Sequence, residues 1–155
     1  MATSPLLQAL YEGRTEEAER LRSEQPELGP FEAAALGDAG RLSELLDAGA
    51  DPNAFAPDGA TALTLAAFFK HPEAVRLLLE RGADPNLRAC HDEFKVKPIH
   101  SAAANRGSVE IVRLLLDAGA EVDAEQPGGF RAIDSARQEG HLELERLLLE
   151  RGAAA

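Results

Sequence analysis

One short run of residues, Cys90-His91-Asp92-Glu93, combines side chains that could bind a metal ion. A thiolate, an imidazole and a carboxylate are all ligands that zinc accepts. Neighbouring residues of one loop rarely converge on a single tetrahedral ion, however, and no second Cys/His pair stands at the spacing of a structural zinc site. We therefore predict no metal or cofactor. A metal-responsive or small-molecule-responsive regulator that uses Cys90, His91 and Asp92 stays open as the alternative function.

The other three histidines, His71, His100 and His141, could serve as general acids or bases. That role requires a nucleophile or an acid placed beside the imidazole, and the sequence offers neither at a recognisable spacing. The sequence also lacks the GxGxxG, GxxxxGKS/T, GxSxG, HExxH and CxxC motifs. We predict a protein without enzymatic activity, in which these histidines have structural roles.

The composition narrows the classes of partner. With 27 acidic and 16 basic residues the net charge is −11, which repels phosphate backbones and anionic lipids and is compatible with a protein partner that has a basic surface. No apolar run approaches the roughly 20 residues of a membrane span, and the first residues do not resemble a signal peptide. Cys90 is the only cysteine, which favours a reducing, cytoplasmic setting. Few lysines beside many arginines and alanines favour a bacterial source.

A sequence segment that recurs along the chain predicts the scaffold that would hold any binding residues. The stretch HPEAVRLLLERGADPN occupies residues 71–86, and its Gly-Ala ending returns with glycines at 49, 82, 119 and 152. The spacings are 33, 37 and 33 residues, and a fixed period in this range marks an array of stacked units. Within residues 73–80 the polar positions share one helix face and the other faces are apolar, which predicts a helix buried on more than one side. Gly82 is placed to end it.

A shorter helix is predicted upstream, over residues 63–69. Thr61 stands where it can cap that helix, and Ala66-Ala67 would let neighbouring backbones approach closely. Pro57-Asp58-Gly59 indicates a tight turn between units. One unit is therefore a turn, a short helix, a longer helix and a loop.

The segment Thr61-Ala62-Leu63-Thr64-Leu65-Ala66-Ala67, followed by the leucine run and the Gly-Ala-Asp-Pro-Asn ending, resembles an ankyrin repeat. The resemblance implies an all-α solenoid of about five helix-turn-helix units with β-turn fingers, three central repeats lying between two degenerate capping repeats. It also implies a structural hydrogen bond for His100. We expect one domain over residues 1–155 and a monomer, with approximate units at 4–27, 28–53, 54–86, 87–123 and 124–155.

Several residues depart from the family pattern. Lys97 and Arg131 replace the capping threonine, and Lys70 replaces the glycine between the two helices of a unit. These departures are expected to weaken local stability without changing the fold. Arg137 and Glu145 replace small and apolar residues in the last unit, which is the pattern of an outer face with no neighbour. We therefore expect a complete array with both caps present.

The resemblance implies a non-enzymatic module that binds another protein through the concave surface formed by the turns and the first helices. None of the six phenylalanines, nor Tyr11, falls in a predicted second helix, and exposed aromatic side chains commonly anchor interfaces. For Phe68 and Phe69, packing between units stays open as an equal alternative. The predicted partner-binding residues are Tyr11, Leu36, Phe68, Phe69, His91, Asp92, Phe94, Lys95, Asn105, Arg106 and Phe130.

The 37-residue interval contains four extra residues. Three of them lengthen the turn at residues 87–96, and the fourth lies in residues 104–107, between two helices. Insertions in repeat arrays map to loops, often on the binding face. We therefore predict that the extended finger at 87–96 contributes to partner binding; a neutral insertion, which costs little entropy, is the alternative.

Overall fold

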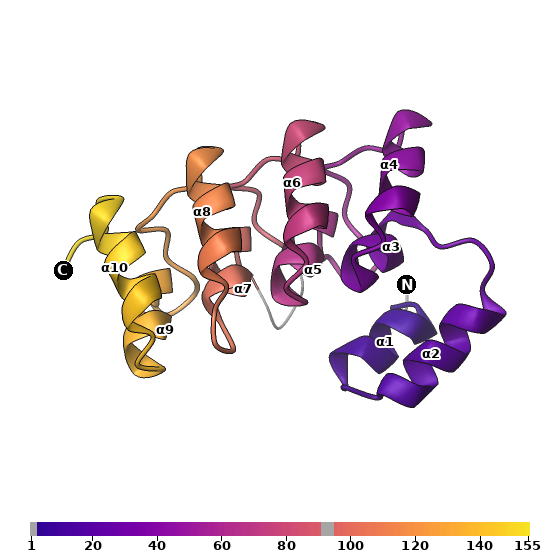
Figure 1. Cartoon of the computed structure of the whole chain (residues 1–155), viewed down its shortest axis with the longest axis horizontal. Coiled ribbons are helices and arrows are strands. Elements are labelled where there is room, and N and C mark those ends of the chain that lie inside the picture. Colours follow the sequence, from indigo (N-terminus) through magenta and orange to yellow (C-terminus); the bar gives the residue numbers. More distant parts are fainter. Residues whose placement is uncertain (1–2, 91–94) are drawn as a thin grey trace.

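The computed structural model describes residues 3–90 and 95–155. These residues form ten helices in five consecutive pairs (Figure 1), and their only extended pairings are two isolated β-bridges, Phe55 with Thr61 and Glu125 with Arg131. The predicted all-α solenoid is confirmed. None of the helices described is long and apolar enough to cross a membrane. The helices are α1 (Pro5–Tyr11), α2 (Thr15–Glu24), α3 (Pro30–Leu36), α4 (Ala39–Asp47), α5 (Ala62–Phe68), α6 (Pro72–Glu80), α7 (Pro98–Ala103), α8 (Val109–Asp117), α9 (Ala132–Gln138) and α10 (Leu142–Glu150).

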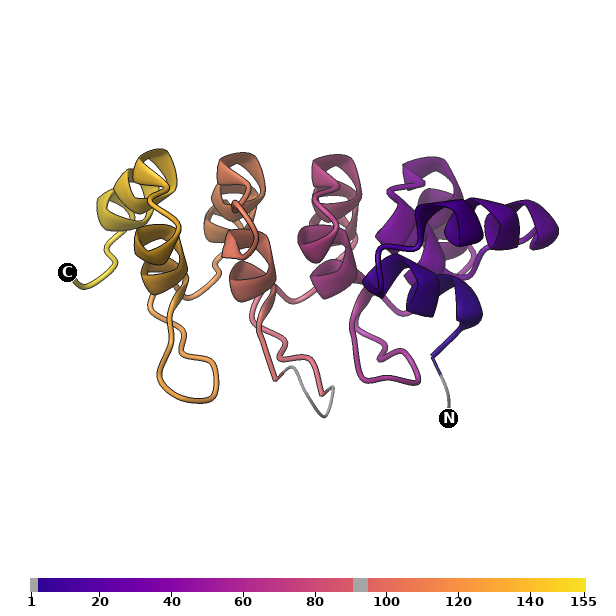
Figure 2. The same ribbon diagram turned by 90° about the horizontal axis from the view of Figure 1, so that it is seen from below.

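The pairs stack side by side along the long axis. The second helices α4, α6, α8 and α10 form one row in Figure 1, and the first helices α3, α5, α7 and α9 form another. The described parts of the connections before α5, α7 and α9 project to one common side as fingers (Figure 2). The first pair, α1 and α2, is turned relative to the four others (Figure 1).

Local sequence explains where the helices of the central unit begin and end. The Thr61 hydroxyl accepts a hydrogen bond from the Thr64 N–H at 3.1 Å, and the Thr64 hydroxyl accepts one from the Thr61 N–H at 2.9 Å. This reciprocal pair satisfies two amides that have no partner within helix α5. Gly82 has φ 92° just after α6, a left-handed conformation that ends the helix. The predicted cap and the predicted helix end are both confirmed.

Helices α7 and α9, where Lys97 and Arg131 replace the capping threonine, keep one of the two reciprocal bonds. The Lys97 N–H donates to Nδ1 of His100 at 3.1 Å, and the Arg131 N–H donates to Oδ2 of Asp134 at 2.9 Å. In each case the side chain of the third helical residue accepts a hydrogen bond from the backbone N–H of the residue just before the helix. These bonds correspond to the bond from the Thr61 N–H to the Thr64 hydroxyl, so what these two units lack is the bond that the threonine hydroxyl accepts. The expected loss of local stability at Lys97 and Arg131 stays a prediction.

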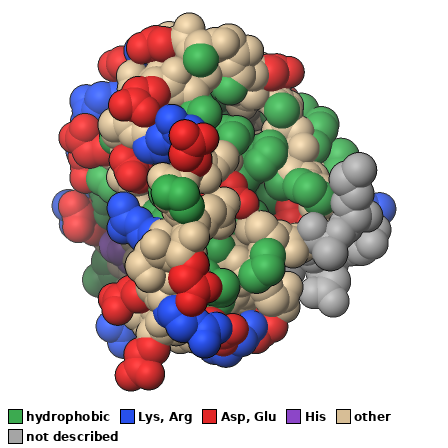
Figure 3. All heavy atoms as spheres, turned by 90° about the vertical axis from the view of Figure 1, so that its right-hand side faces the viewer, with side chains coloured by type: hydrophobic (Ala, Val, Ile, Leu, Met, Phe, Trp, Pro, Cys, Tyr) green, Lys and Arg blue, Asp and Glu red, His purple; other side chains and the backbone are tan. Residues whose placement is uncertain are grey.

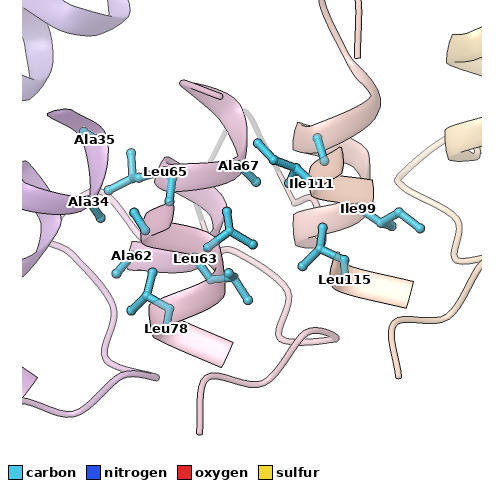
Figure 4. Packing of buried hydrophobic residues seen from close by; sticks show 14 of the residues in the cluster. Ala34, Ala35, Ala62, Leu63, Leu65, Ala67, Leu78, Ile99, Ile111 and Leu115 are labelled. Carbon is cyan, nitrogen blue, oxygen red and sulfur yellow. The ribbon is translucent and has the colours of Figure 1, made fainter. Parts of the chain in front are cut away.

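Buried aliphatic side chains form one core that runs through the whole stack, and Figure 4 shows its central part. Leu78 and Leu115 of the second helices have no exposed surface, and neither do the paired alanines of the first helices, Ala66-Ala67 and Ala102-Ala103. The small alanine side chains let successive first helices pack closely, as the sequence predicted. Each pair thus buries apolar surface both between its own two helices and against the neighbouring pairs.

A repeated polar bracket joins consecutive units at their loops. The side-chain amide of Asn53 donates to the Gly82 carbonyl at 3.1 Å and accepts from the Asp84 N–H at 2.7 Å. Asn86 makes the same two bonds to Gly119 and Glu121 one unit later, at 3.0 and 2.8 Å. The bracket repeats with the period of the sequence and so fixes the spacing of the units.

The histidines also bridge units. His100 is 4% exposed; its Nδ1 accepts from Lys97, so its Nε2 carries the proton and donates to the Ala124 carbonyl at 2.8 Å. Nε2 of His71 lies 2.9 Å from the Ala35 carbonyl, and Nε2 of His141 lies 3.1 Å from the Gly107 carbonyl. These three structural roles, predicted from the sequence, are confirmed.

Protonation of His100 is expected to destabilise the fold. Burial lowers the pKa of His100 below its ordinary 6.5, and the protonated ring could no longer accept the Lys97 N–H. The unfolded chain then binds the proton more readily than the folded chain, so the free energy of unfolding should fall as the pH drops below about 6.5. Urea unfolding at pH 7.5 and 5.5 measures this loss. A His100→Gln variant, which cannot titrate, should lose less between the two pH values; an equal loss would refute the assignment.

Candidate functional site

A groove of about 680 Å³ runs between the first helices and the fingers. We call it the concave groove. Its apolar lining includes Tyr11, Leu65, Phe68 and Val96. Its polar lining consists of His100 and of the neutral side chains of Thr3, Gln8, Thr64, Ser101, Asn105, Gln126 and Ser135. No Asp, Glu, Lys or Arg belongs to the described lining. The volume lies in the range of pockets that hold small molecules or short peptide segments.

Three aromatic rings meet at one end of this groove. The Phe68 and Phe69 rings are 5.0 Å apart and nearly perpendicular at 88°, and the Tyr11 ring lies 6.4 Å from Phe68 and 5.8 Å from Phe69. Such offset and edge contacts stabilise aromatic groups beyond their buried area. Tyr11 and Phe68 nevertheless remain 37% exposed each, whereas Phe69 packs against the core. We call Tyr11, Phe68 and Phe69 the aromatic cluster; it combines the packing and the exposure that the sequence left as alternatives.

The turned first pair places Tyr11 in the cluster. Tyr11 is the last residue of α1, and its hydroxyl donates to Oδ2 of Asp58 in the finger before α5, at 3.2 Å. Burial, and then the charge and hydrogen bond of Asp58, raise the pKa of Tyr11 above its ordinary 10.0, so the hydroxyl remains a donor at neutral pH. Helix α1 therefore reaches past the second pair to the third and closes one end of the groove.

The structure separates the other predicted site residues. Asn105 lines the groove, and Arg106 is exposed on the same loop without lining it. Phe130 is 37% exposed on its finger, and Lys95 is exposed as well. Leu36 packs against the core and does not line the groove. His91, Asp92 and Phe94 lie outside the described residues.

Sequence reasoning missed most of the neutral polar lining. Gln8, Thr64, Ser101 and Ser135 belong to first helices, where they face the fingers, and Gln126 belongs to a finger. Such residues interrupt no motif and carry no charge. The one signal that could have found the four helical residues is their position in the first helices, close to the buried alanines.

Hydrogen bonds from one backbone N–H and from one arginine side chain connect neighbouring fingers. The Cys90 N–H donates to the Gly59 carbonyl of the preceding finger at 2.8 Å. The Arg88 guanidinium donates to the Lys95 carbonyl at 2.6 Å and to the Glu125 carbonyl of the following finger at 3.0 Å. The finger wall of the groove is therefore continuous across three units. Cys90 is exposed, and no three His, Cys, Asp or Glu side chains in the described parts of the chain could hold a metal ion.

Hydrophobic and charged side chains occupy different parts of the surface at the N-terminal end of the stack. In Figure 3, hydrophobic side chains gather toward the centre and right of this face. Acidic and basic side chains dominate its left and lower edges. On this face, charged groups thus lie mostly at the edges, whereas the apolar surface is concentrated.

Stacked helix pairs, projecting fingers and an uncharged groove between them define a helical repeat protein of the solenoid class. The chain belongs to the ankyrin repeat family: the family model described as ankyrin repeats (3 copies) matches residues 2–89 and again residues 87–155. The predicted resemblance is confirmed.

Curated relatives place this domain in different proteins. The ankyrin repeat domain-containing protein SAT10 of Stachybotrys chartarum is 38% identical over 125 residues, which are 81% of this chain and only 6% of that protein. Cyclin-dependent kinase 4 inhibitor B of Rattus norvegicus is 34% identical over 117 residues, 75% of this chain and 86% of the inhibitor. Glycerophosphocholine phosphodiesterase gde1 of Schizosaccharomyces pombe is 36% identical over 103 residues, 66% of this chain and 9% of that enzyme. All three organisms are eukaryotes, so these relatives do not support the predicted bacterial source.

Proposed function

We propose that the chain is a non-enzymatic module that holds a partner protein in the concave groove and uses the aromatic cluster as its anchor. The observation that carries this proposal is the meeting of three rings from the first and third helix pairs at one end of an uncharged groove. Large aromatic groups with part of their surface exposed are the usual hot spots of protein interfaces.

Other features agree with this role. The inhibitor among the relatives is named for its action on a protein kinase, and the matched region makes up most of its length. The net charge of −11 favours a partner with a basic surface. We further propose that the finger at 87–96 extends the contact, and that Asn105 and Arg106 act at the far side of the groove. His91, Asp92, Phe94, Lys95 and Phe130 complete the proposed set; Leu36, which packs against the core and does not line the groove, is left out of it.

Truncation of Phe68 should release the partner. A Phe68→Ala variant loses the exposed ring that lines the groove, and removal of a hot-spot side chain typically costs about 2 kcal/mol or more, roughly a 30-fold loss of affinity. Proteins retained from a lysate of the source organism by wild type and variant can be compared by quantitative mass spectrometry. The affinity of the protein found is then measured by calorimetry.

Leu142→Ala is the matched control. Leu142 is 73% exposed at the start of α10, far from the aromatic cluster along the stack (Figure 1), so its removal should leave binding unchanged. Circular dichroism and urea unfolding establish that both variants keep the fold. A partner retained equally by Phe68→Ala and wild type would refute the groove assignment, and so would a partner lost only with Leu142→Ala.

A further inference from the structure

Backbone strain is concentrated at one place beside the groove. Among the described residues, Lys70, Asn105 and Arg106 are the non-glycine residues with positive φ, at 62°, 52° and 59°. The left-handed conformation costs a residue with a side chain roughly 1–2 kcal/mol. Gly37 and Gly140 occupy the position of Lys70 in other units, with φ of 72° and 66°. A lysine in this glycine position therefore requires a compensating interaction.

The ammonium group of Lys70 supplies that interaction. Nζ donates three hydrogen bonds to backbone carbonyls of the next unit: Ser101 at 2.9 Å, Ala102 at 3.0 Å and Ala104 at 2.8 Å. These carbonyls lie at the C-terminal end of α7, where carbonyls have no partner within the helix and the helix dipole is negative. A side chain from one unit thus caps a helix of the next.

The loop that follows α7 is held from the other side as well. The Arg106 N–H donates to Oε2 of Glu139, which belongs to the connection between α9 and α10, at 2.5 Å. Residues 104–107, which contain the extra residue between α7 and α8, are thereby fixed by a cation from the preceding unit and a carboxylate from the following one. Ala104 and Asn105 of this loop line the groove.

The charged form of Lys70 is the one that can bind all three carbonyls. Burial lowers the pKa of Lys70 to about 8, and the Glu139 carboxylate opposes that shift. At pH 7 the group is therefore mostly an ammonium, with one N–H for each of the three carbonyls. A neutral amine has only two N–H groups and would leave one carbonyl without its donor.

We infer that Lys70 is a positioning residue of the concave groove: by capping α7 it fixes the loop at 104–107 so that Asn105 presents its amide to the main chain of a bound peptide segment. This inference rests on the proposed function. The Asn105 amide carries two donors and an acceptor, and the neutral side chains of Thr64, Ser101 and Gln126 line the same groove. Main-chain amides, each with one donor and one acceptor, match such a surface, whereas a charged side chain would find no opposite charge in the described lining.

The test compares Lys70→Gly, which removes both the cap and the strain, with Lys70→Met, which keeps the stem and removes the charge. Hydrogen exchange of the full-length chain should become at least tenfold faster at residues 104–107 in both variants and stay unchanged at residues 61–69. In wild type, the amide resonances of Asn105 and Arg106 should shift with a midpoint near pH 8, and Lys70→Met should abolish that shift. A Lys70→Gly variant with unchanged exchange would overturn the inference, because relief of strain alone predicts an equal or more stable loop.

Binding is measured separately with the partner protein recovered by the wild-type chain. We expect an affinity loss of at least tenfold for Lys70→Gly. Faster exchange with unchanged affinity would overturn the link between Lys70 and binding and leave the groove assignment intact. If Phe68→Ala has no effect on affinity, the proposed function fails, while the exchange results still decide whether Lys70 holds the loop.

Discussion

A Gly107→Ala variant is expected to be less stable than wild type by about 3 kcal/mol, because overpacking of a closely packed site forces backbone shifts. A Cβ atom at this position would lie 2.6 Å from the Ala103 carbonyl oxygen, 2.9 Å from the Ala103 Cα and 2.6 Å from Cδ2 of Leu144. Two of these atoms belong to backbone that Lys70 and α7 hold in place. The Gly107 carbonyl also lies 3.1 Å from Nε2 of His141, so a shift would loosen the last pair. Urea unfolding measures the loss.

Gly40→Ala is the control for that variant. Gly40 lies in the first turn of α4, and a Cβ atom there would meet only Oδ1 of Asp38, at 3.7 Å. Alanine is favoured over glycine inside a helix by about 0.5–1 kcal/mol, so this variant should be slightly more stable than wild type. Equal stability of the Gly107→Ala and Gly40→Ala variants would contradict the close approach of α7 and α10 to Gly107.

A Leu78→Ala variant should lose about 3 kcal/mol of stability. Leu78 of α6 has no exposed surface and lies with Ala62 and Leu63 of α5 in the core of the third pair (Figure 4). Replacing a fully buried leucine by alanine removes its transfer free energy and leaves a cavity, at a typical cost of 2–5 kcal/mol. Because the third pair joins the two halves of the stack, its weakening should also broaden the urea transition.

The same substitution at an exposed position isolates the effect of burial. Leu142→Ala, at a site that is 73% exposed, should change the free energy of unfolding by no more than about 0.5 kcal/mol. If Leu78→Ala and Leu142→Ala were destabilised equally, the central core would not have the packing described above.

The architecture could be predicted because each unit encodes its own boundaries. The recurring glycines at 49, 82, 119 and 152 have φ between 92° and 101° and end α4, α6, α8 and α10. Thr61 marked the start of α5 and the alanine pairs marked the close packing of first helices. These signals are local, and the stacking of similar units then leaves little choice of topology.

The site could be predicted only in part, because its geometry depends on contacts between units. The sequence singled out Tyr11 and Phe68, but nothing local encodes the turn of the first pair that brings their rings together. Lys70 was expected to be a source of instability. Its partners are backbone carbonyls of α7, which no sequence pattern reveals. The segment to which the inserted residue was assigned is the loop between α7 and α8, although the positive φ of Asn105 and Arg106 in that loop was not foreseen.

The contact between Tyr11 and the third pair also affects how the chain folds and unfolds. In a linear array each unit depends on its immediate neighbours, so the ends fray one unit at a time. Here the hydroxyl bond to Asp58 and the ring contact with Phe69 join the first pair directly to the third. On the ribosome, the first pair can complete its native contacts only after residue 69 has emerged. In the finished protein, we expect these contacts to make the first three pairs open together, so that the N-terminal end resists the stepwise fraying of a bare solenoid end.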